Sequence, residues 1–436
     1  MTRISPRVLK GFRDILPDNE LVRRALIQKL ESAFRRFGYV PIDTPTLEYT
    51  EVLLGKGGGE TDKQVFRFTD HGGRDVAMRF DLTVPFARYM AAHQAQLYTP
   101  FRRYHIGKAW RGENTQRGRY REFVQCDFDI VGTDSASADV ETLLTVMDAF
   151  SVLGVEHVQV HVAHRGLFSR FLSNIGYGDR SEEVLRTVDK LRKVGAEQTR
   201  QNLAEITGAE SAEKIMQCIT ASGPPRDVLS TLEGLAGGPA EDSERMREVL
   251  TAVEEAGGGK NIIYDPSITR GLDYYTGIVF ETFLDALPEI GSVCSGGRYN
   301  DLASLYSRQD LPGVGGSVGL DRLLAALEQL GQQPSPGRTA DVLVMCFETG
   351  MLGYYHRIAA ALRGAGISAE VFPEARKLGQ QFSYAEKKGI PVGVLCGPDE
   401  KEAGIINWKD LTSRESFRAD GIEQATEDIR ARLETL

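Results

Sequence analysis

The chain is poor in cysteine and histidine, and their spacing suits neither cross-links nor a metal site. Five of the 436 residues are cysteine and seven are histidine, and no two cysteines stand in a Cys-x-x-Cys pattern. A scattered, odd set of cysteines argues against a disulfide framework and against a structural zinc site. His161 and His164 lie in a segment that reads as a strand, where a spacing of three puts them on opposite faces. We therefore expect no metal ion held by protein side chains.

Long apolar runs are absent as well. No stretch approaches the roughly 18–20 residues that cross a bilayer, and residues 1–6 lack the apolar core of a secretory signal. Apolar residues make up 41% of the chain and charged residues 26%, as in a soluble globular protein. We expect a cytoplasmic protein that makes no contact with membranes.

An excess of basic charge is lacking too. The net charge is −9, which counts against a generic nucleic-acid binder, although an acidic protein can still dock RNA through a local basic face. The glycine-rich residues 55–59 do not complete the phosphate-loop pattern Gly-x-x-x-x-Gly-Lys-Ser/Thr. We interpret them as a loop.

The start of the chain predicts a long helix followed by an extended segment. Apolar residues recur at helical spacing over residues 21–37, with Asp18 as a candidate N-cap and Gly38 as the end. Residues 40–45 contain two prolines, which fit a strand at a sheet edge. An amphipathic helix packed on its own core would show the same periodicity, so the pattern alone does not predict an interface between chains.

Strand patterns dominate next and then give way to helical ones. Residues 65–68 and 76–80 flank a Gly-Gly turn and predict an antiparallel hairpin. Further short strands extend to Val131 and predict an antiparallel sheet. From about residue 179 to residue 259, charged and helix-favouring stretches replace the strands, which predicts a helical insertion before strand character returns at 262–264.

The last hundred residues have a different organisation. Residues 331–338 are rich in glycine, proline and glutamine, which is typical of a linker. Strands then alternate with helices, a pattern that predicts a mixed or parallel α/β sheet. The predicted elements are a strand at 342–347, a helix at 354–363, a strand at 368–372, a helix at 377–388 and a strand at 391–396.

Three motifs carry arginines, glycines and carboxylates but no nucleophile of the Ser-His-Asp kind. They are Trp110-Arg-Gly-Glu113 with Arg119-Tyr-Arg-Glu-Phe-Val-Gln125, then Arg270-Gly-Leu-Asp-Tyr-Tyr-Thr-Gly277, then Val314-Gly-Gly-Ser-Val-Gly-Leu-Asp-Arg322. Alternate residues from 119 to 125 share one face if that segment is a strand. Taken alone, the second motif also fits a hairpin with a structural pair between Arg270 and Asp273.

In this order the motifs resemble motif 2, the histidine-specific signature and motif 3 of the histidyl-tRNA synthetases, a class II aminoacyl-tRNA synthetase family. The resemblance covers nearly the whole chain. It implies an α+β catalytic domain at 1–330, with an antiparallel sheet flanked by helices and the insertion at about 179–259. A linker at 331–338 and a C-terminal α/β anticodon-binding domain at 339–436 follow. The segment at 20–45 resembles motif 1, which implies a homodimer.

The resemblance also implies the reaction: ATP-dependent attachment of L-histidine to tRNA(His) through a histidyl-adenylate. Such chemistry rests on positioning and fixed positive charge rather than on a protein nucleophile. By resemblance, Arg111 and Arg270 are catalytic and Mg²⁺ enters through the ATP phosphates. The implied ATP-binding residues are Arg111, Glu113, Arg119, Arg121, Phe123 and Arg322. The implied histidine-binding residues are Asp81, Leu82, Thr83, Arg111, Gln125, Asp129, Arg270, Tyr274 and Tyr275.

Two alternatives stay open. One is the non-catalytic, histidine-sensing regulatory subunit of ATP phosphoribosyltransferase, a paralogue that generally lacks the anticodon-binding domain and has eroded ATP motifs. Here Arg111, Arg270, Arg322 and the C-terminal segment are all present. The other is a class II synthetase for a different amino acid, against which the segment from Arg270 to Tyr275 argues. Two segments depart from the family pattern: Ser295-Gly-Gly-Arg-Tyr-Asn-Asp301 and the proline-free loop 112–117.

Overall fold

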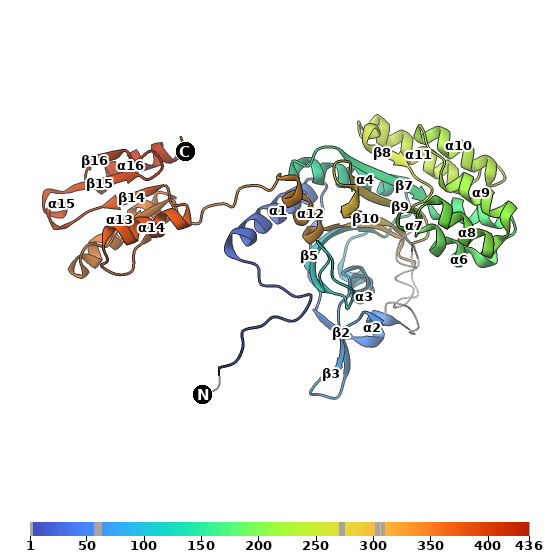
Figure 1. Ribbon diagram of the computed structural model, residues 1–436, viewed down its shortest axis with the longest axis horizontal. Helices are drawn as coiled ribbons and strands as arrows, with labels where there is room; N and C mark the ends of the chain where they lie inside the picture. The colour runs from blue at the N-terminus through green and yellow to red at the C-terminus, as the bar shows by residue number, and fades with distance from the viewer. Residues whose placement is uncertain (1–2, 56–62, 270–274, 301–305, 307–309, 436) are drawn as a thin grey trace. The chain divides into compact units, whose positions relative to one another are not determined.

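The chain folds into two compact units, Met1–Pro334 and Ser335–Leu436, each with its own hydrophobic core (Figure 1). A computed structural model describes residues 3–55, 63–269, 275–300, 306 and 310–435. Among these residues, no helix is both long enough and apolar enough to cross a membrane.

The larger unit is built on a mixed, largely antiparallel sheet of eight strands over the described residues. Only the two edge pairs, β1 with β5 and β7 with β8, are parallel. In their order across the sheet the strands are β1 (Val40–Pro41), β5 (Phe101–Trp110), β6 (Glu122–Val131), β11 (Gly313–Gly319), β10 (Cys294–Tyr299), β9 (Ile278–Leu284), β7 (Val158–His164) and β8 (Ile262–Tyr264).

Alternation along β6 divides the sheet into a core face and a second face. Val124, Cys126 and Phe128 are buried in one hydrophobic core with helices α1 (Pro17–Arg36), α4 (Ala136–Leu153) and α12 (Leu320–Leu330). Because side chains alternate along a strand, Gln125, Asp127 and Asp129 project from the opposite face. The polar residues of β6 are therefore collected on one side.

Helix α1 lies where the periodicity placed it, but two details of this region were wrong. The N-cap is Leu16 rather than Asp18, and Pro17 occupies the first helical turn, where its fixed φ suits a helix start and its missing N–H costs no hydrogen bond. The strand expected over 40–45 is limited to Val40–Pro41, since prolines within that stretch supply no N–H to a ladder.

A smaller three-stranded sheet lies beside the main one (Figure 1). Its strands, in the order β2 (Leu47–Tyr49), β4 (Asp75–Met78) and β3 (Arg67–Thr69), pair antiparallel. The β3–β4 pair confirms the hairpin predicted around Gly72 and Gly73. Neighbouring helices are α2 (Thr50–Leu54), α3 (Thr83–His93) and the 3-10 turn η2 (Gln94–Gln96).

Helices fill the stretch between β7 and β8. They begin with α5 (Arg165–Asn174), whose N-cap is His164, and they share one hydrophobic core with the sheet and α4. The others are η3 (Gly178–Arg180), α6 (Ser181–Val188), α7 (Leu191–Val194), α8 (Ala196–Thr207), α9 (Ala209–Ile219), α10 (Pro225–Leu235), α11 (Glu241–Glu255) and η4 (Gly259–Asn261). A further 3-10 turn, η5 (Pro288–Ile290), follows β9.

The smaller unit is the predicted α/β sheet flanked by helices. Its strand order is β13 (Ala369–Val371), β12 (Val342–Val344), β14 (Val392–Leu395), β15 (Ile405–Asp410) and β16 (Ser416–Asp420). The first two pairs are parallel and the last two antiparallel. The helices are η7 (Thr349–Met351), α13 (Leu352–Gly364), α14 (Leu378–Lys388), α15 (Pro398–Ala403) and α16 (Ile422–Leu433).

Glycines allow close packing at the centre of the large sheet. A Cβ added to Gly296 on β10 would lie 2.2 Å from the carbonyl oxygen of Gly315 and 2.4 Å from the Phe280 ring. A carbonyl oxygen of the neighbouring strand cannot move aside as the end of a flexible side chain can. The close approach of the strands therefore requires glycine at position 296.

Gly296→Ala is expected to destabilise the larger unit by about 3 kcal/mol, the upper part of the range for overpacking a core. The measurement is the melting temperature of the full chain. Ser295→Ala is the matched control, because Ser295 is exposed on the same strand. Equal melting temperatures for the two variants would contradict the proposed backbone clash.

Candidate active site

A cleft opens over β6, β10 and β11. Its empty volume, including the open mouth, is about 680 Å³. Small side chains form part of its wall: Ser295 of β10 and Ser317 of β11 are direct cross-strand partners, and Ser317 also pairs with Asp127 of β6. The lining residues are Arg111, Glu113, Gly118, Arg119, Tyr120, Phe123, Val124, Gln125, Ser292, Val293, Cys294, Ser295, Ser317, Gly319, Asp321 and Arg322.

Three arginines and two carboxylates give the cleft its charge. Arg111 donates from Nε to the Phe80 carbonyl at 2.9 Å, and its Cζ lies 5.2 Å from the centroid of the Phe123 ring. Nη1 of Arg119 lies 3.5 Å from a carboxylate oxygen of Glu113. The three cations of the cleft make it a site for an anion.

Arg322 is held by a backbone carbonyl and is partly buried. Its Nη1 donates to the Ser292 carbonyl. Burial lowers the pKa of Arg322 from its usual value, and the nearby cations of Arg119 and Arg111 lower it further. Because such a group gains most when an anion enters, Arg322 is suited to a phosphate.

Asp321 joins the start of α12 to β6. Its Oδ2 accepts a hydrogen bond from the Val124 amide at 2.7 Å, and its Oδ1 pairs with Arg13. The guanidinium of Arg13 also lies 3.7 Å from the centroid of the Tyr120 ring. These contacts fix Arg322, the next residue in the chain, relative to the strand that carries Phe123.

Gln125, which lines the cleft, also contacts a second group of residues. Nε2 of Gln125 donates to Ser317 at 3.1 Å and to Asp127 at 3.4 Å. The Thr83 hydroxyl donates to Asp127 at 3.5 Å, and Oδ1 of Asp81 accepts the Val84 amide at 3.0 Å in the first turn of α3. Gln125 thus connects the arginine cleft to a buried acidic region.

The acidic region consists of three buried carboxyl groups, Asp81, Asp127 and Asp129. Burial raises the pKa of Asp81 to about 6 and that of Asp127 to about 7. Burial also raises the pKa of Asp129, although the Arg103 cation and the Tyr299 hydroxyl oppose the effect. A buried anion is costly unless a cation or hydrogen-bond donors stabilise it, so the region is suited to a positively charged group.

Two buried acceptors of this region point to a missing donor. Oδ2 of Asp81 and Oε1 of Gln125 have no hydrogen-bond partner among the described residues. Buried polar atoms are nearly always satisfied in folded proteins. A ligand ammonium group, with three N–H donors, would supply what these atoms lack.

A row of glycines lies beside Asp129. Asp129 pairs with Gly315 across β6 and β11, and Gly315 pairs with Gly297 across β11 and β10. A Cβ at Gly315 would lie 2.1 Å from Oδ1 of Asp129, and one at Gly297 would lie 3.0 Å from the Tyr275 ring. The Tyr299 hydroxyl donates to Oδ1 of Asp129. These glycines therefore let the Asp129 carboxylate and the Tyr275 ring pack directly against the strands.

The predicted site residues are distributed as follows. The cleft brings together Arg111, Glu113, Arg119, Phe123, Gln125 and Arg322. Arg121 is not among its lining residues: strand β6 begins only at Glu122, so the alternation expected from residue 119 starts later, and Arg121 donates to the carbonyls of Glu113 and Lys10. The side chain of Leu82 is buried at the start of α3. Arg270 and Tyr274 lie outside the described residues.

Sequence reasoning missed Arg103, Asp127 and Tyr299. Asp127 continues the alternation of Gln125 and Asp129, which is the signal that could have identified it. Arg103 and Tyr299 come from strands distant in the sequence. Only the pairing of Arg103 with Asp129, and the hydrogen bond from Tyr299, place them at the site.

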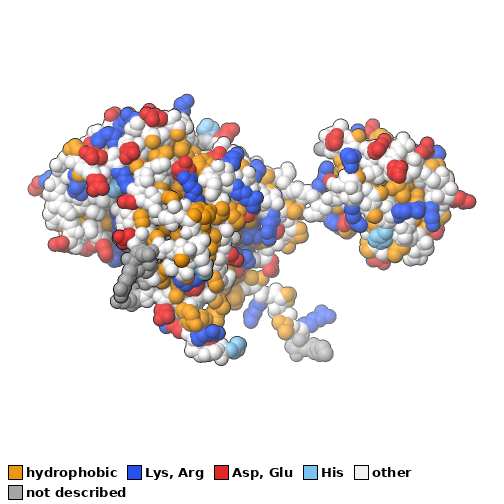
Figure 2. Space-filling model, turned by 180° about the vertical axis from the view of Figure 1, so that it is seen from behind, with side chains coloured by type: hydrophobic (Ala, Val, Ile, Leu, Met, Phe, Trp, Pro, Cys, Tyr) orange, Lys and Arg blue, Asp and Glu red, His pale blue; other side chains and the backbone are white. Residues whose placement is uncertain are grey.

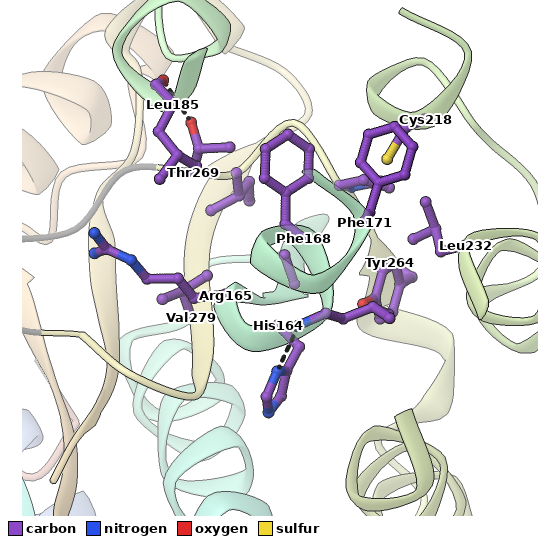
Figure 3. A pocket seen from close by; sticks show the side chains of 14 residues that line it. His164, Arg165, Phe168, Phe171, Leu185, Cys218, Leu232, Tyr264, Thr269 and Val279 are labelled. Carbon is purple, nitrogen blue, oxygen red and sulfur yellow. Dashed lines mark hydrogen bonds between the residues drawn. The ribbon is translucent and has the colours of Figure 1, made fainter. Parts of the chain in front are cut away.

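A separate, mainly apolar cavity lies between the sheet and the inserted helices (Figure 3). Its wall includes Phe168 and Phe171 of α5, together with Tyr264 of β8. Thr269 donates to the carbonyl of Leu185 on α6 at 3.2 Å, and this bond is drawn in Figure 3. Since the space holds little more than one water-sized group, we assign it to packing between the insertion and the sheet.

Metal-binding clusters of three or more His, Cys, Asp or Glu side chains are absent from the described part of the chain. His161 instead pairs through Nδ1 with Asp265 at 2.8 Å, and His164 accepts the Leu167 amide at 3.3 Å. Both histidines therefore have structural partners.

Comparison with known proteins places the chain in a family. A histidyl-tRNA synthetase family model matches residues 11–323, and an anticodon-binding domain model matches residues 341–431. The histidine–tRNA ligase of Treponema denticola is 50% identical, over 98% of each chain. The crystal structure of histidyl-tRNA synthetase from Nostoc sp. PCC 7120 superposes with a TM-score of 0.87 at 30% identity, covering 99% of this chain and 100% of that one.

A more distant structure bears on the regulatory alternative. It is described as an ATP phosphoribosyltransferase regulatory subunit/histidyl-tRNA synthetase from Bacillus halodurans, and it superposes with a TM-score of 0.74 over 88% of this chain and 97% of its own. At 22% identity this likeness shows the fold alone. The matched anticodon-binding domain favours the synthetase. The chain belongs to the histidyl-tRNA synthetase family of class II aminoacyl-tRNA synthetases.

Proposed function

We propose that this chain, as a histidine–tRNA ligase, carries out its two chemical steps along the cleft of β6. The observation that carries the proposal is the continuity of two environments: an arginine-lined cleft at one end of β6 and a buried acidic region at the other, joined by Gln125. A substrate with both a carboxylate and an ammonium group would be oriented by that polarity.

The arginine cleft is the proposed ATP site. Phe123 would stack on adenine, with Arg322 on the other face of the ring and reaching the γ-phosphate. Arg111 would hold the α-phosphate and the histidine carboxylate, and its cation already acts on both Asp81 and Arg322. Glu113 and Arg119 complete the site, while Arg121 shapes the loop through its carbonyl contacts.

The acidic region is the proposed histidine site. The α-ammonium group would lie among Asp81, Thr83 and Gln125, where Asp81 and Gln125 have acceptors without donors among the described residues. The imidazole would lie over the glycine row, read by Asp129 and Tyr275, with Tyr274 on the same segment. A site that satisfies both ring nitrogens rejects amino acids that lack them.

In the first step, an oxygen of the histidine carboxylate would attack the α-phosphorus of ATP. A new P–O bond forms, the bond to the β-phosphate oxygen breaks, and pyrophosphate leaves. Arg111 and Arg270 would stabilise the negative charge that develops on the phosphate oxygens. In the second step a ribose hydroxyl of the tRNA attacks the acyl carbon, loses its proton and displaces AMP.

Magnesium is proposed to enter with ATP, bound mainly by phosphate oxygens. The carboxylates that line the cleft, Glu113 and Asp321, face arginines already, which fits a cation carried by the nucleotide rather than a cage built by the protein. When bound, Mg²⁺ would supply positive charge to the phosphates, and Glu113 of the cleft wall could help to hold it.

The C-terminal unit is the proposed anticodon-binding domain, with α14 and its preceding loop as the contact. Arg376, Lys377 and Lys387 are exposed there and suited to phosphates. Gln381 is fully buried and holds this loop: it donates to the carbonyls of Arg376 and Cys346, each at 2.8 Å, and accepts the Cys346 amide. We propose that the protein acts in the cytoplasm.

The function itself is tested by ATP–pyrophosphate exchange with each amino acid in turn. We expect exchange with histidine only. Exchange with another amino acid would favour a different class II specificity, and no exchange at all would favour the regulatory paralogue.

A homodimer is proposed as the working form. The apolar stripe of α1 does not itself support this, because Val22, Leu26, Leu30 and Phe34 are buried in the chain's own core. Support comes from the small sheet, where Leu47, Tyr49 and Phe68 are each nearly half exposed. Figure 2 shows hydrophobic side chains open to solvent on the larger unit, and an apolar surface of this kind suits a partner.

Light scattering of the full chain at micromolar concentration is expected to give twice the mass of one chain. Leu47→Lys with Phe68→Lys should shift the mass towards one chain, because both positions are exposed in the single chain and need no repacking there. The control is Leu352→Lys in the smaller unit, because Leu352 is also exposed. Phe417→Lys would be unsuitable, because Phe417 stacks on Trp408. A parent protein with the mass of one chain would exclude the dimer.

Deletion of the chain from Gly331 onward is expected to weaken tRNA charging while leaving histidine-dependent pyrophosphate exchange largely intact. The reason is that the catalytic residues all lie before Pro334, within one compact unit. A truncated protein that charges tRNA as well as the full chain would contradict the anticodon-binding assignment.

Arg270→Ala is expected to slow pyrophosphate exchange roughly 100- to 1,000-fold, the usual effect of losing a preorganised transition-state donor. Apparent binding of histidine and ATP should change less. Arg270→Lys should recover part of the rate, since a point charge lacks the fork geometry. A variant with a lower melting temperature but normal single-turnover exchange would indicate a structural salt bridge instead.

A further inference from the structure

A buried cation lies beneath the proposed histidine site. Arg103 of β5 is fully buried, and its Cζ lies 4.1 Å from the centroid of the Phe86 ring. Its Nε and both terminal nitrogens make no hydrogen bond to described residues. A guanidinium in such surroundings is stable only beside negative charge.

That charge comes from β6. Arg103 and Asp129 are direct cross-strand partners, and Nη2 of Arg103 lies 2.7 Å from Oδ2 of Asp129. The same nitrogen lies 4.0 Å from Oδ2 of Asp127. One arginine therefore faces two carboxylates on the same side of the strand, and the nearer of them is the group proposed to read the imidazole.

The other charged groups near this site in the described part of the chain do not replace Arg103. Asp81 adds a third carboxyl group to the region. His105 is kept neutral, because burial and the cations of Arg103 and Arg79 lower its pKa to about 3. Arg79 donates to the carbonyls of Lys108 and Thr44, and Arg111 to that of Phe80. Arg103 is thus the cation in direct contact with Asp129.

We propose that Arg103 is a positioning residue for histidine recognition, holding Asp129 as a fixed, ionised acceptor for an imidazole N–H while sharing its charge with Asp127. The inference rests on the proposed role of Asp129. Tyr299 donates to Oδ1 of Asp129 and Arg103 lies at Oδ2, so the plane of the carboxylate is held from both ends. An ionised Asp129 accepts a hydrogen bond from a ring N–H, which selects one imidazole tautomer.

The balance of charges makes the proposal testable. Removing Arg103 would leave three buried carboxyl groups and, among the described residues, no cation in contact with Asp129, which favours protonation of Asp129. A protonated Asp129 would offer a donor where an acceptor is needed. Removing the charge of Asp127 at the same time would restore the original balance of charge.

Arg103→Met is the first variant, measured by histidine-dependent pyrophosphate exchange between pH 6.5 and pH 9. At pH 7, kcat/KM for histidine should fall roughly 100-fold or more, as expected when one partner of a buried ion pair is lost, with the KM for ATP nearly unchanged. The ratio of variant to parent kcat/KM should rise with pH, because Asp129 without Arg103 ionises only at higher pH. Using the ratio cancels the titration of histidine itself.

Two further variants test charge rather than packing. Arg103→Lys keeps a cation, so the pH profile should match that of the parent. Its kcat/KM for histidine should fall by about tenfold or less, because an ammonium group lacks the fork geometry of a guanidinium. Adding Asp127→Asn to Arg103→Met should raise kcat/KM for histidine roughly tenfold above that of Arg103→Met alone, a coupling typical of groups in one buried network. The single variant Asp127→Asn completes the double-mutant cycle. If Arg103→Met does not fold, the Lys variant and its pH profile decide the matter.

Arg298→Met is the matched control, because Arg298 is also buried and pairs with a buried aspartate, Asp139, at 2.8 Å. It should lower the melting temperature without a pH-dependent loss of histidine use. If Arg103→Met behaves in the same way, with ATP and histidine parameters falling together and no recovery in the double variant, Arg103 is structural and the inference is wrong.

Asp129→Asn separates this inference from the proposed function. If that variant uses histidine normally, the assigned role of Asp129 fails. If it loses histidine use while Arg103→Met retains it, the role of Asp129 stands and the role of Arg103 fails.

Discussion

The burial of three acidic groups beside Arg103 is the constraint on which the rest of the catalytic unit depends. Asp81, Asp127 and Asp129 come from two segments of the chain, and each is almost inaccessible to water. In an apolar environment such groups stay ionised only beside cations and donors. Arg103 supplies part of that charge from the neighbouring strand, at 2.7 Å from Asp129. The acceptors left on Asp81 and Gln125 are the part that a substrate would satisfy.

The sheet provides the geometry for this arrangement. Direct cross-strand pairing puts Asp129, Gly315 and Gly297 in one row, and Asp127, Ser317 and Ser295 in the next. The glycines of the first row allow the Asp129 carboxylate to lie close to β11, and the second row carries two hydroxyl groups. The same strands reach the arginine cleft at their other end. The proximity of the two environments therefore follows from register, since residues two apart on β6 face the same way.

The contact between α12 and β6 holds the arginine-lined end of the cleft in a similar way. Asp321 binds the Val124 amide and Arg13, and thereby fixes the helix start that carries Arg322. Arg322 in turn contacts the carbonyl of Ser292, which precedes β10. Residues from three separate parts of the sequence thus hold one cation in place. A charge that is fixed before the substrate arrives needs little reorganisation during the reaction.

The sequence by itself determined the class of the fold, the order of elements and most of the charged groups. Helical periodicity placed α1 and the α/β alternation of the C-terminal unit, and the spacing from Arg111 to Gln125 identified one wall of the cleft. It failed at helix and strand ends, as at Pro17 and Glu122, because capping and prolines act on single residues. Only the tertiary structure decided that Arg103 and Tyr299 meet at the carboxylate of Asp129. Strand order and register set that contact, and no local pattern in the sequence encodes which strand lies beside which.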